Sequence, residues 1–202
     1  VEPAYFIYGI KIKSHPKALI ETEERVNILL STPVDIILAA DLLAGENKLP
    51  ESLMFIQKDG NQSVVRVAFP RPGNYKLRIF AKRKSESGDY KWVLEYKVIA
   101  RKGTGEWVNF PEVYGSFKVK DGYLYSPLKG VLHAGKKEFF KLSVPTAKRV
   151  LVVMDDNKWV ELSKYGDVFT GNVLIEGDLV KVCGNFTENS DDFDVLLEYK
   201  VH

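Results

Sequence analysis

Apolar and polar residues alternate with a period of two along much of this chain, and branched and aromatic side chains are frequent in the alternating segments. This pattern is typical of β-strands with one buried face. The segments that show it best are residues 64–69, 75–80 and 92–98 in the first half and 139–144, 149–154, 172–175 and 179–183 in the second. No long amphipathic helix is indicated, and residues 48–55 offer the best place for a helical turn. We therefore expect an all-β protein.

The end of the chain repeats its middle. Residues 93–98 read Val-Leu-Glu-Tyr-Lys-Val, and residues 196–201 read Leu-Leu-Glu-Tyr-Lys-Val. Other similar segments follow in the same order in both halves, which indicates an internal duplication. One such pair is residues 8–13 and 114–120. The repeat predicts two domains, residues 1–103 and 104–202, each of roughly a hundred residues and large enough to fold independently.

A turn in the first copy indicates how its strands are connected. Residues 70–75 read Pro-Arg-Pro-Gly-Asn-Tyr, a tight turn that leads into a strand beginning with tyrosine. Immunoglobulin-like domains enter their penultimate strand in this way, and the tyrosine hydroxyl bonds to backbone across the corner. The second copy has Leu179 at the equivalent turn, so this hydroxyl is missing there, and neither copy has the paired cysteines of antibody domains. We predict two tandem immunoglobulin-like antiparallel β-sandwiches.

Composition favours a folded protein of a reducing compartment. Apolar residues make up 45% of the chain, and the formal net charge is +2. The longest apolar run, residues 34–43, is interrupted by two aspartates and is too short to cross a bilayer. No signal peptide is visible at the start, and the single cysteine, Cys183, cannot form an internal disulfide. We expect a cytoplasmic protein without a transmembrane segment.

Charge is distributed unevenly between the two copies. Residues 1–103 hold 17 Lys and Arg against 12 Asp and Glu, whereas residues 104–202 hold 12 against 15. Lys82, Arg83 and Lys84 form a basic run where a sandwich places its last hairpin, and such a run can attract acidic protein surfaces, actin-like filaments or anionic lipid headgroups. The plainer interpretation is a solvated hairpin. We do not expect nucleic acid as a partner, because the overall charge is near neutral and no stacking platform beside a basic groove is indicated.

The three tryptophans differ in their expected roles. Trp92 and Trp159 lie in strand-like segments, so we expect both to be core residues, and residues 155–157 are expected to form a turn before Trp159. Trp107 follows the predicted domain boundary, and we expect it to pack between the domains and fix their orientation. Exposure of Trp107 or Trp159 would instead indicate a binding hot spot.

Few residues suggest catalysis or metal binding. Cys183 lies in an alternating segment and is expected to fill space in a core, while His15, His133 and the terminal His202 lack the spacing of metal ligands. The acidic segment 188–194 lacks the spacing of a calcium loop, so a solvated hairpin is favoured over a calcium site. We predict no catalytic residue, metal or cofactor in this chain.

Several of these segments together resemble the tandem immunoglobulin-like region of the kyphoscoliosis peptidase and hillarin family. The matching pieces extend along the whole chain and are residues 5–16, 65–70, 73–75, 110–117 and 126–128, with the Leu-Glu-Tyr strand of each copy. The resemblance implies a cytoplasmic, cytoskeleton-associated protein whose transglutaminase-like domain, with its Cys, His and Asp, precedes this region. None of the motifs of that catalytic domain occurs here.

We therefore expect a non-catalytic protein-interaction and scaffolding module that binds a cytoskeletal partner and is accessory to an upstream transglutaminase-like peptidase domain. The alternative is a carbohydrate- or ligand-binding β-sandwich, an accessory module of an enzyme, which predicts exposed coplanar aromatics or a calcium site. Catalysis within the chain is a third hypothesis, and it requires Cys183 to be exposed beside a histidine.

Overall fold

The computed structural model of the protein describes residues 1–155 and 158–202, so the predicted turn at 155–157 lies partly outside the described residues. The chain divides into two compact units, Val1–Trp107 and Val108–His202. The first unit extends slightly past the boundary that the repeat predicts, and the independent folding of each copy stays a prediction. In the described part of the chain, no helix is long and apolar enough to span a membrane.

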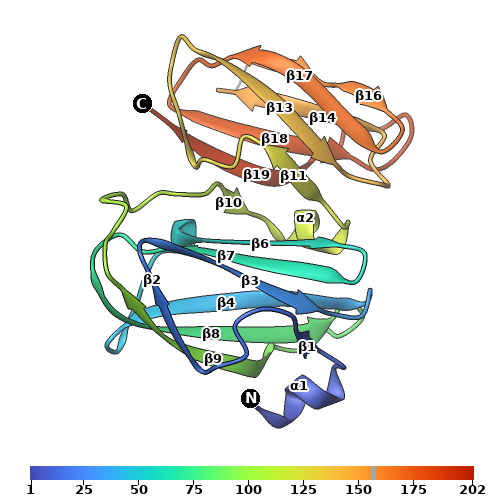
Figure 1. Cartoon of the computed structure of the whole chain (residues 1–202). Coiled ribbons are helices and arrows are strands. Elements are labelled where there is room, and N and C mark those ends of the chain that lie inside the picture. The colour runs from blue at the N-terminus through green and yellow to red at the C-terminus, as the bar shows by residue number, and fades with distance from the viewer. Residues whose placement is uncertain (156–157) are drawn as a thin grey trace. The chain divides into compact units, whose positions relative to one another are not determined.

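The first unit is built from two β-sheets (Figure 1). Its elements in chain order are α1 (Pro3–Ile7), β1 (Lys11–Ile12), β2 (Leu19–Thr22), β3 (Arg25–Ser31), β4 (Ile36–Ala44), β5 (Asn47–Lys48), the 3₁₀ turn η1 (Glu51–Leu53), β6 (Met54–Asp59), β7 (Gln62–Ala68), β8 (Gly73–Arg83) and β9 (Lys91–Ala100). One sheet has the strand order β1-β3-β7-β6, and the other has the order β2-β9-β8-β4-β5. The helical turn expected within residues 48–55 is η1.

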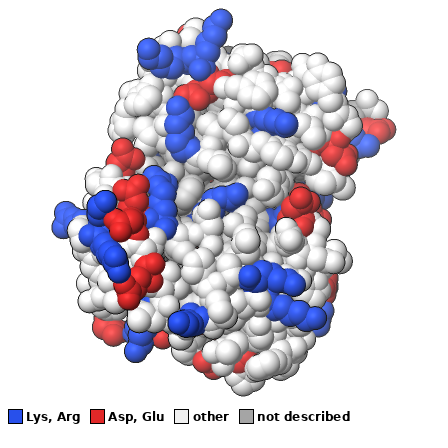
Figure 2. Space-filling model, in the orientation of Figure 1, with Lys and Arg blue, Asp and Glu red and all other residues white. Residues whose placement is uncertain are grey.

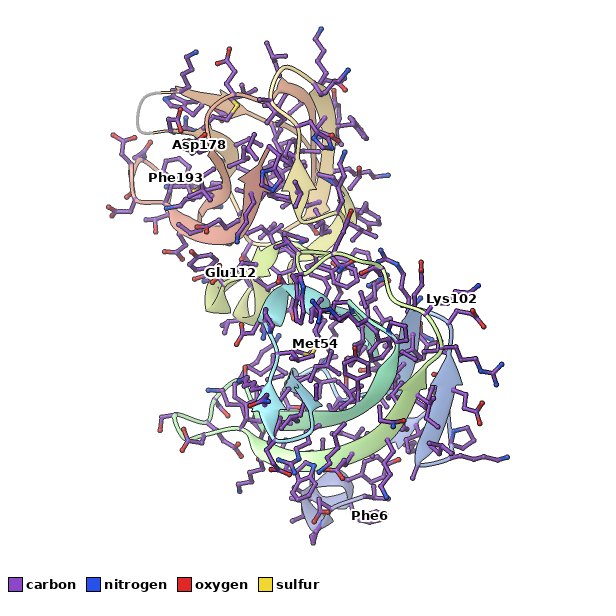
Figure 3. All side chains as sticks on the ribbon, turned by 90° about the vertical axis from the view of Figure 1, so that its left-hand side faces the viewer. Phe6, Met54, Lys102, Glu112, Asp178 and Phe193 are labelled. Carbon is purple, nitrogen blue, oxygen red and sulfur yellow. The ribbon has the colours of Figure 1, made fainter. Side chains whose placement is uncertain are left out.

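The core of the first unit lies between its two sheets. Strand β3 alternates exposed and buried residues as the sequence pattern predicts, and its buried Ile28 belongs to the same apolar cluster as Leu77 of β8 and Val98 of β9. Figure 3 shows Met54 among these packed side chains, whereas Phe6 projects outward from α1. Burial of one face of each strand thus determines which face of each sheet is left for a partner.

The second unit repeats this arrangement. Its elements are β10 (Glu112–Val113), α2 (Gly115–Val119), β11 (Tyr123–Ser126), β12 (Val131–Leu132), β13 (Lys137–Ser143), β14 (Arg149–Met154), β15 (Lys158–Glu161), β16 (Ser163–Tyr165), β17 (Val168–Leu174), β18 (Leu179–Asn185) and β19 (Asp194–Val201). The sheet β11-β13-β17-β16 corresponds to β1-β3-β7-β6. In the other sheet, β12 pairs in parallel with the last strand β19, as β2 does with β9. The predicted all-β fold of immunoglobulin-like sandwiches is confirmed.

The first unit contains the predicted tyrosine corner. The hydroxyl of Tyr75 donates to the backbone carbonyl of Arg71 at 2.7 Å. The Tyr75 ring packs against Phe69, with 4.9 Å between the ring centroids. This contact ties the start of β8 to the turn before it and closes one end of the core.

The second unit uses a different tyrosine to bond its backbone. The hydroxyl of Tyr199, in the repeated Leu-Glu-Tyr strand, is fully buried and donates to the carbonyl of Pro127 at 2.9 Å. The equivalent residue of the first unit is Tyr96, whose buried hydroxyl has no hydrogen-bond partner among the described residues. Burial raises the pKa of Tyr96 to about 12, because ionisation is costly in this environment. The same strand sequence therefore has different polar contacts in the two units.

Removing the hydroxyl of Tyr199 and that of Tyr96 should affect stability differently. We expect Tyr199→Phe to lower the free energy of unfolding of the second unit by about 1–2 kcal/mol, since a buried carbonyl loses its donor. Tyr96→Phe should leave the first unit unchanged or slightly stabilised, because its hydroxyl is buried without a partner. Hydrogen exchange of core amides measures each unit separately. Equal destabilisation by both substitutions would contradict this difference.

Candidate interaction surfaces

The predicted basic run lies at the end of β8, where it enters the turn to β9. Arg83 forms an ion pair with Asp35, with 2.5 Å between Nη1 and Oδ2. The Lys82 ammonium lies 4.8 Å from the ring centroid of Tyr90, and the backbone N–H of Lys84 donates to the carbonyl of Asp35 at 2.8 Å. All three basic side chains are half-buried. The run is thus on the predicted hairpin, but part of its charge is held by groups of the same unit, and a role in partner binding stays a prediction.

A hydrogen-bond network joins this hairpin to the segment that follows α1. The Tyr8 hydroxyl donates to Glu86 Oε2 at 2.9 Å, and the same oxygen accepts the Arg83 backbone N–H at 3.2 Å. Both donors lower the pKa of Glu86, and the Arg83 backbone N–H has the larger effect. The pKa of Tyr8 is raised, mainly by burial and also by the hydrogen bond to Glu86. The hairpin is therefore held in place at its base by several directed contacts.

The outward side chains of β4, β8 and β9 form a surface that we call the β8–β9 face. In register across it lie Asp41, Arg78 and Glu95. Arg78 Nε donates to Glu95 Oε2 at 2.9 Å, and Asp41 lies 2.7 Å from Lys48 Nζ. Opposite charges in this row therefore have fixed partners. Elsewhere on the surface, Figure 2 shows Asp and Glu beside Lys and Arg at the left-hand edge of the view.

Trp92 lies on the β8–β9 face, and its prediction as a core residue is wrong. The pairing of β8 with β9 shifts register after Ile79, so that Phe80 faces Trp92 and Val93 is passed over. Val93 is fully buried instead, whereas Trp92 is 38% exposed. The guanidinium of Arg78 lies 5.2 Å from the Trp92 ring centroid, which fixes the indole beside the charged row.

Trp159 is also outside the core, contrary to prediction. It lies on β15 at the edge of its sheet and is 56% exposed. Its neighbour Val160 faces the fully buried Val152 of β14, so alternation turns Trp159 to the outer face. Exposed tryptophans are frequent binding hot spots, and this one meets the criterion stated from the sequence.

Trp107 belongs to the first unit and is 42% exposed. Its ring centroid lies 5.7 Å from the guanidinium of Arg71, and its carbonyl accepts a hydrogen bond of 2.7 Å from Ser52 Oγ. These contacts fix the end of the segment that follows β9. Packing of Trp107 between the domains stays a prediction.

The residues considered for catalysis do not come together as an active site requires. Cys183 is buried, and burial raises the pKa of its thiol while Lys181 partly offsets this, so a reactive thiolate is disfavoured. The His15 ring bonds its neighbour Ser14, with 2.9 Å between Nδ1 and Oγ. Among the described residues, no group of three or more His, Cys, Asp or Glu is placed to hold a metal ion.

The alternative, a carbohydrate- or ligand-binding module, requires exposed coplanar aromatics or a calcium site, and the aromatic pair and the acidic loop described next do not provide them. The rings of Tyr123 and Tyr125 are neighbours at 4.9 Å but are inclined by 55°, so this pair is not a flat sugar-binding platform. In the acidic segment, Asn185 Nδ2 donates to the carbonyls of Ser190 and Asp192, at 2.8 Å and 2.9 Å. These bonds explain the shape of the loop without an ion.

The ion pair at the base of the hairpin makes the first unit sensitive to acid. The hydrogen bond from Arg83 holds the pKa of Asp35 below its ordinary value of 3.8. As pH falls, Asp35 is therefore protonated in the unfolded chain before it is protonated in the folded one. The stability that the ion pair contributes is complete above the unfolded pKa and is lost as pH falls through the lower, folded pKa. We expect Asp35→Asn to reduce the loss of first-unit stability between pH 7 and pH 2, measured by urea unfolding. Arg83→Gln should act alike, and an unchanged pH dependence in both variants would contradict the assignment.

The chain is similar in sequence to known proteins. A family model of the KY-like, immunoglobulin-like domain matches residues 1–111. Kyphoscoliosis peptidase of Homo sapiens is 30% identical over 210 residues, and that of Mus musculus is 28% identical over 210 residues. Both matches cover 100% of this chain, which spans 32% of the length of each relative.

Solved structures of tandem β-sandwich modules are also similar to the chain. The fibronectin(III)-like modules of Clostridium thermocellum CbhA are 14% identical, with 95% of this chain and 93% of theirs covered and a TM-score of 0.28. A tandem of titin immunoglobulin domains is 11% identical, with 96% of each chain covered and a TM-score of 0.28. The family resemblance seen in the sequence is confirmed by the family model and the curated relatives. The chain belongs to the KY-like, immunoglobulin-like domain family, and along its whole length it is similar to kyphoscoliosis peptidase.

Proposed function

We propose that this chain is a non-catalytic protein-interaction and scaffolding module of a cytoplasmic, cytoskeleton-associated protein. The observation that carries the proposal is the β8–β9 face, on which Trp92 is exposed beside the fixed guanidinium of Arg78. Tryptophan and arginine are the residues that most often anchor protein interfaces, and a sheet face that holds them in place loses little conformational freedom on binding. Cytoskeletal association rests on the family resemblance.

The proposal includes an accessory role beside a transglutaminase-like peptidase domain. The relatives are named as peptidases, and this chain corresponds to a minor part of their length. The buried Cys183, with its raised thiol pKa, supports a non-catalytic role for this part. In this proposal the two sandwiches bring the peptidase domain to the protein that they bind.

Affinity capture from cytosolic and cytoskeletal extracts tests the proposed function. We expect the immobilised chain to retain a cytoskeletal protein saturably, and Trp92→Ala to lower the affinity by about ten-fold or more, as loss of a hot spot does. Lys82→Glu with Lys84→Glu tests the basic run and leaves the Arg83–Asp35 pair in place.

Reduced recovery by the lysine variant would assign binding to the hairpin, and unchanged recovery would exclude it. Trp159→Ala removes the exposed indole of the second unit, which is also a hot-spot candidate, so a loss of affinity from Trp159→Ala and not from Trp92→Ala would move the binding site to the second unit. A chain that retains no protein from either extract would contradict the proposed function.

A further inference from the structure

A pocket opens on the β8–β9 face, at the end of the sheet away from the hairpin turn. Its volume of about 360 Å³ is within the range of small ligand-binding sites. The side chains that matter for its chemistry are Leu19 of β2, Lys76 of β8, and Lys97 and Ile99 of β9. Glu46, in the turn between β4 and β5, also lines the pocket. All of these residues belong to the first unit.

The two lysines of the pocket form a cross-strand pair of like charges, which is unfavourable in a β-sheet. Lys76 and Lys97 are directly opposite each other on neighbouring antiparallel strands. Like charges in such positions repel and destabilise a sheet. Among the described residues, neither ammonium has an ion-pair partner, whereas Arg78 in the next row is paired with Glu95. The pocket thus has two ammonium groups against one carboxylate, that of Glu46, which in the described part of the chain forms no ion pair with either lysine, and this excess of positive charge is one that folding alone does not explain.

Apolar side chains flank these charges. Leu19 is in register with Lys97 and is 49% exposed, and Ile99 is 36% exposed. Surface leucine and isoleucine side chains that line a concave site gain free energy when a partner covers them. The pocket thus combines an apolar wall with a pair of cations. This combination suits a ligand that has an apolar group with negatively charged groups next to it.

The strand that borders the pocket favours a polypeptide as the occupant. β2 pairs with β9 on one side, through bonds such as that from Lys97 N to the Ala18 carbonyl at 2.8 Å. On its other side, no strand of the described chain pairs with it. An extended segment can bond to this edge by main-chain hydrogen bonds and then cross onto the face, where its next side chains reach the pocket and the lysines of β9 and β8.

We propose that this pocket binds an acidic, extended segment of a partner protein, with a bulky apolar side chain inserted between Leu19 and Ile99 and flanking carboxylates on Lys76 and Lys97. The inference rests on the proposed function as a protein-interaction module and specifies the chemistry of its partner. Repulsion between the two lysines is relieved when the segment binds, so the feature that destabilises the free sheet favours the complex.

Titration of the isotope-labelled chain with short peptides, followed by NMR, tests the site directly. The probe is Glu-Asp-Phe-Asp-Glu with blocked ends, and the comparison peptides are Gln-Asn-Phe-Asn-Gln and Glu-Asp-Gly-Asp-Glu. We expect the probe to shift the resonances of Leu19, Val98 and Ile99, and each comparison peptide to bind about ten-fold more weakly. A higher salt concentration should weaken binding of the probe. No shift at these residues up to about 1 mM probe, or preferential binding of phosphatidylserine vesicles, would overturn the proposal.

Lys97→Glu separates a binding role from a structural one. It replaces the repulsive pair by an attractive one, so we expect the thermal midpoint of the first unit to rise by about 1–5 °C while probe binding is lost. Lys11→Glu, an exposed change of equal charge on the other sheet, should leave the binding unchanged. Retained binding by Lys97→Glu would contradict the site.

Affinity capture from the extracts distinguishes a failure of the pocket proposal from a failure of the proposed function. If the native chain and Lys97→Glu capture the same partner equally well, the pocket proposal fails and the proposed function stands. If the native chain captures nothing, the proposed function fails, whatever the peptides show.

Discussion

The last strand of each unit is the element on which the rest of the sandwich depends. β9 lies between its parallel partner β2 and the antiparallel β8, and β19 pairs in parallel with β12 and antiparallel with β10 and β18, so several strands are hydrogen-bonded to this one element. Its inward tyrosine, Tyr96 or Tyr199, fills the core, and its outward glutamate orients a neighbour. Glu95 holds Arg78, whereas Glu198 accepts the Tyr114 hydroxyl at 3.0 Å. Retention of the Leu-Glu-Tyr sequence in both copies has this physical explanation, because every residue of it makes contacts on a fixed face.

The β8–β9 face combines order with incomplete charge compensation. Around Arg78 the opposite charges are paired, which positions Trp92, whereas Lys76 and Lys97 repel each other. Exposed ion pairs contribute little to stability, so their main consequence here is orientation of side chains. A surface that is rigid in one row and unneutralised in the next is suited to a partner that brings its own carboxylates.

Features set by local sequence could be predicted, and features set by register could not. The strands follow from alternation, and the Tyr75 corner follows from the turn chemistry of residues 70–75. The orientation of Trp92 depends on a bulge opposite Ile79, which shifts the alternation of β9 by one residue, and because residues 92–94 are all apolar the sequence does not reveal this shift. Lys76 is one of several basic residues near the predicted hairpin in the sequence, but its position opposite Lys97 depends on strand pairing that only the folded sheet shows. The basic run lies at the end of β8, and the pairing of its Arg83 with Asp35 is equally non-local in the sequence.

Zero-length carbodiimide cross-linking of the native chain to its captured partner, followed by mass spectrometry, tests whether an acidic segment of the partner lies against Lys76 and Lys97. The reagent joins a lysine only to a carboxylate in contact with it, so it reports which ammonium groups face an acidic segment. We expect cross-links from Lys76 and Lys97 to one acidic stretch of the partner. Cross-links confined to Lys82 and Lys84, or to lysines of the second unit, would contradict it.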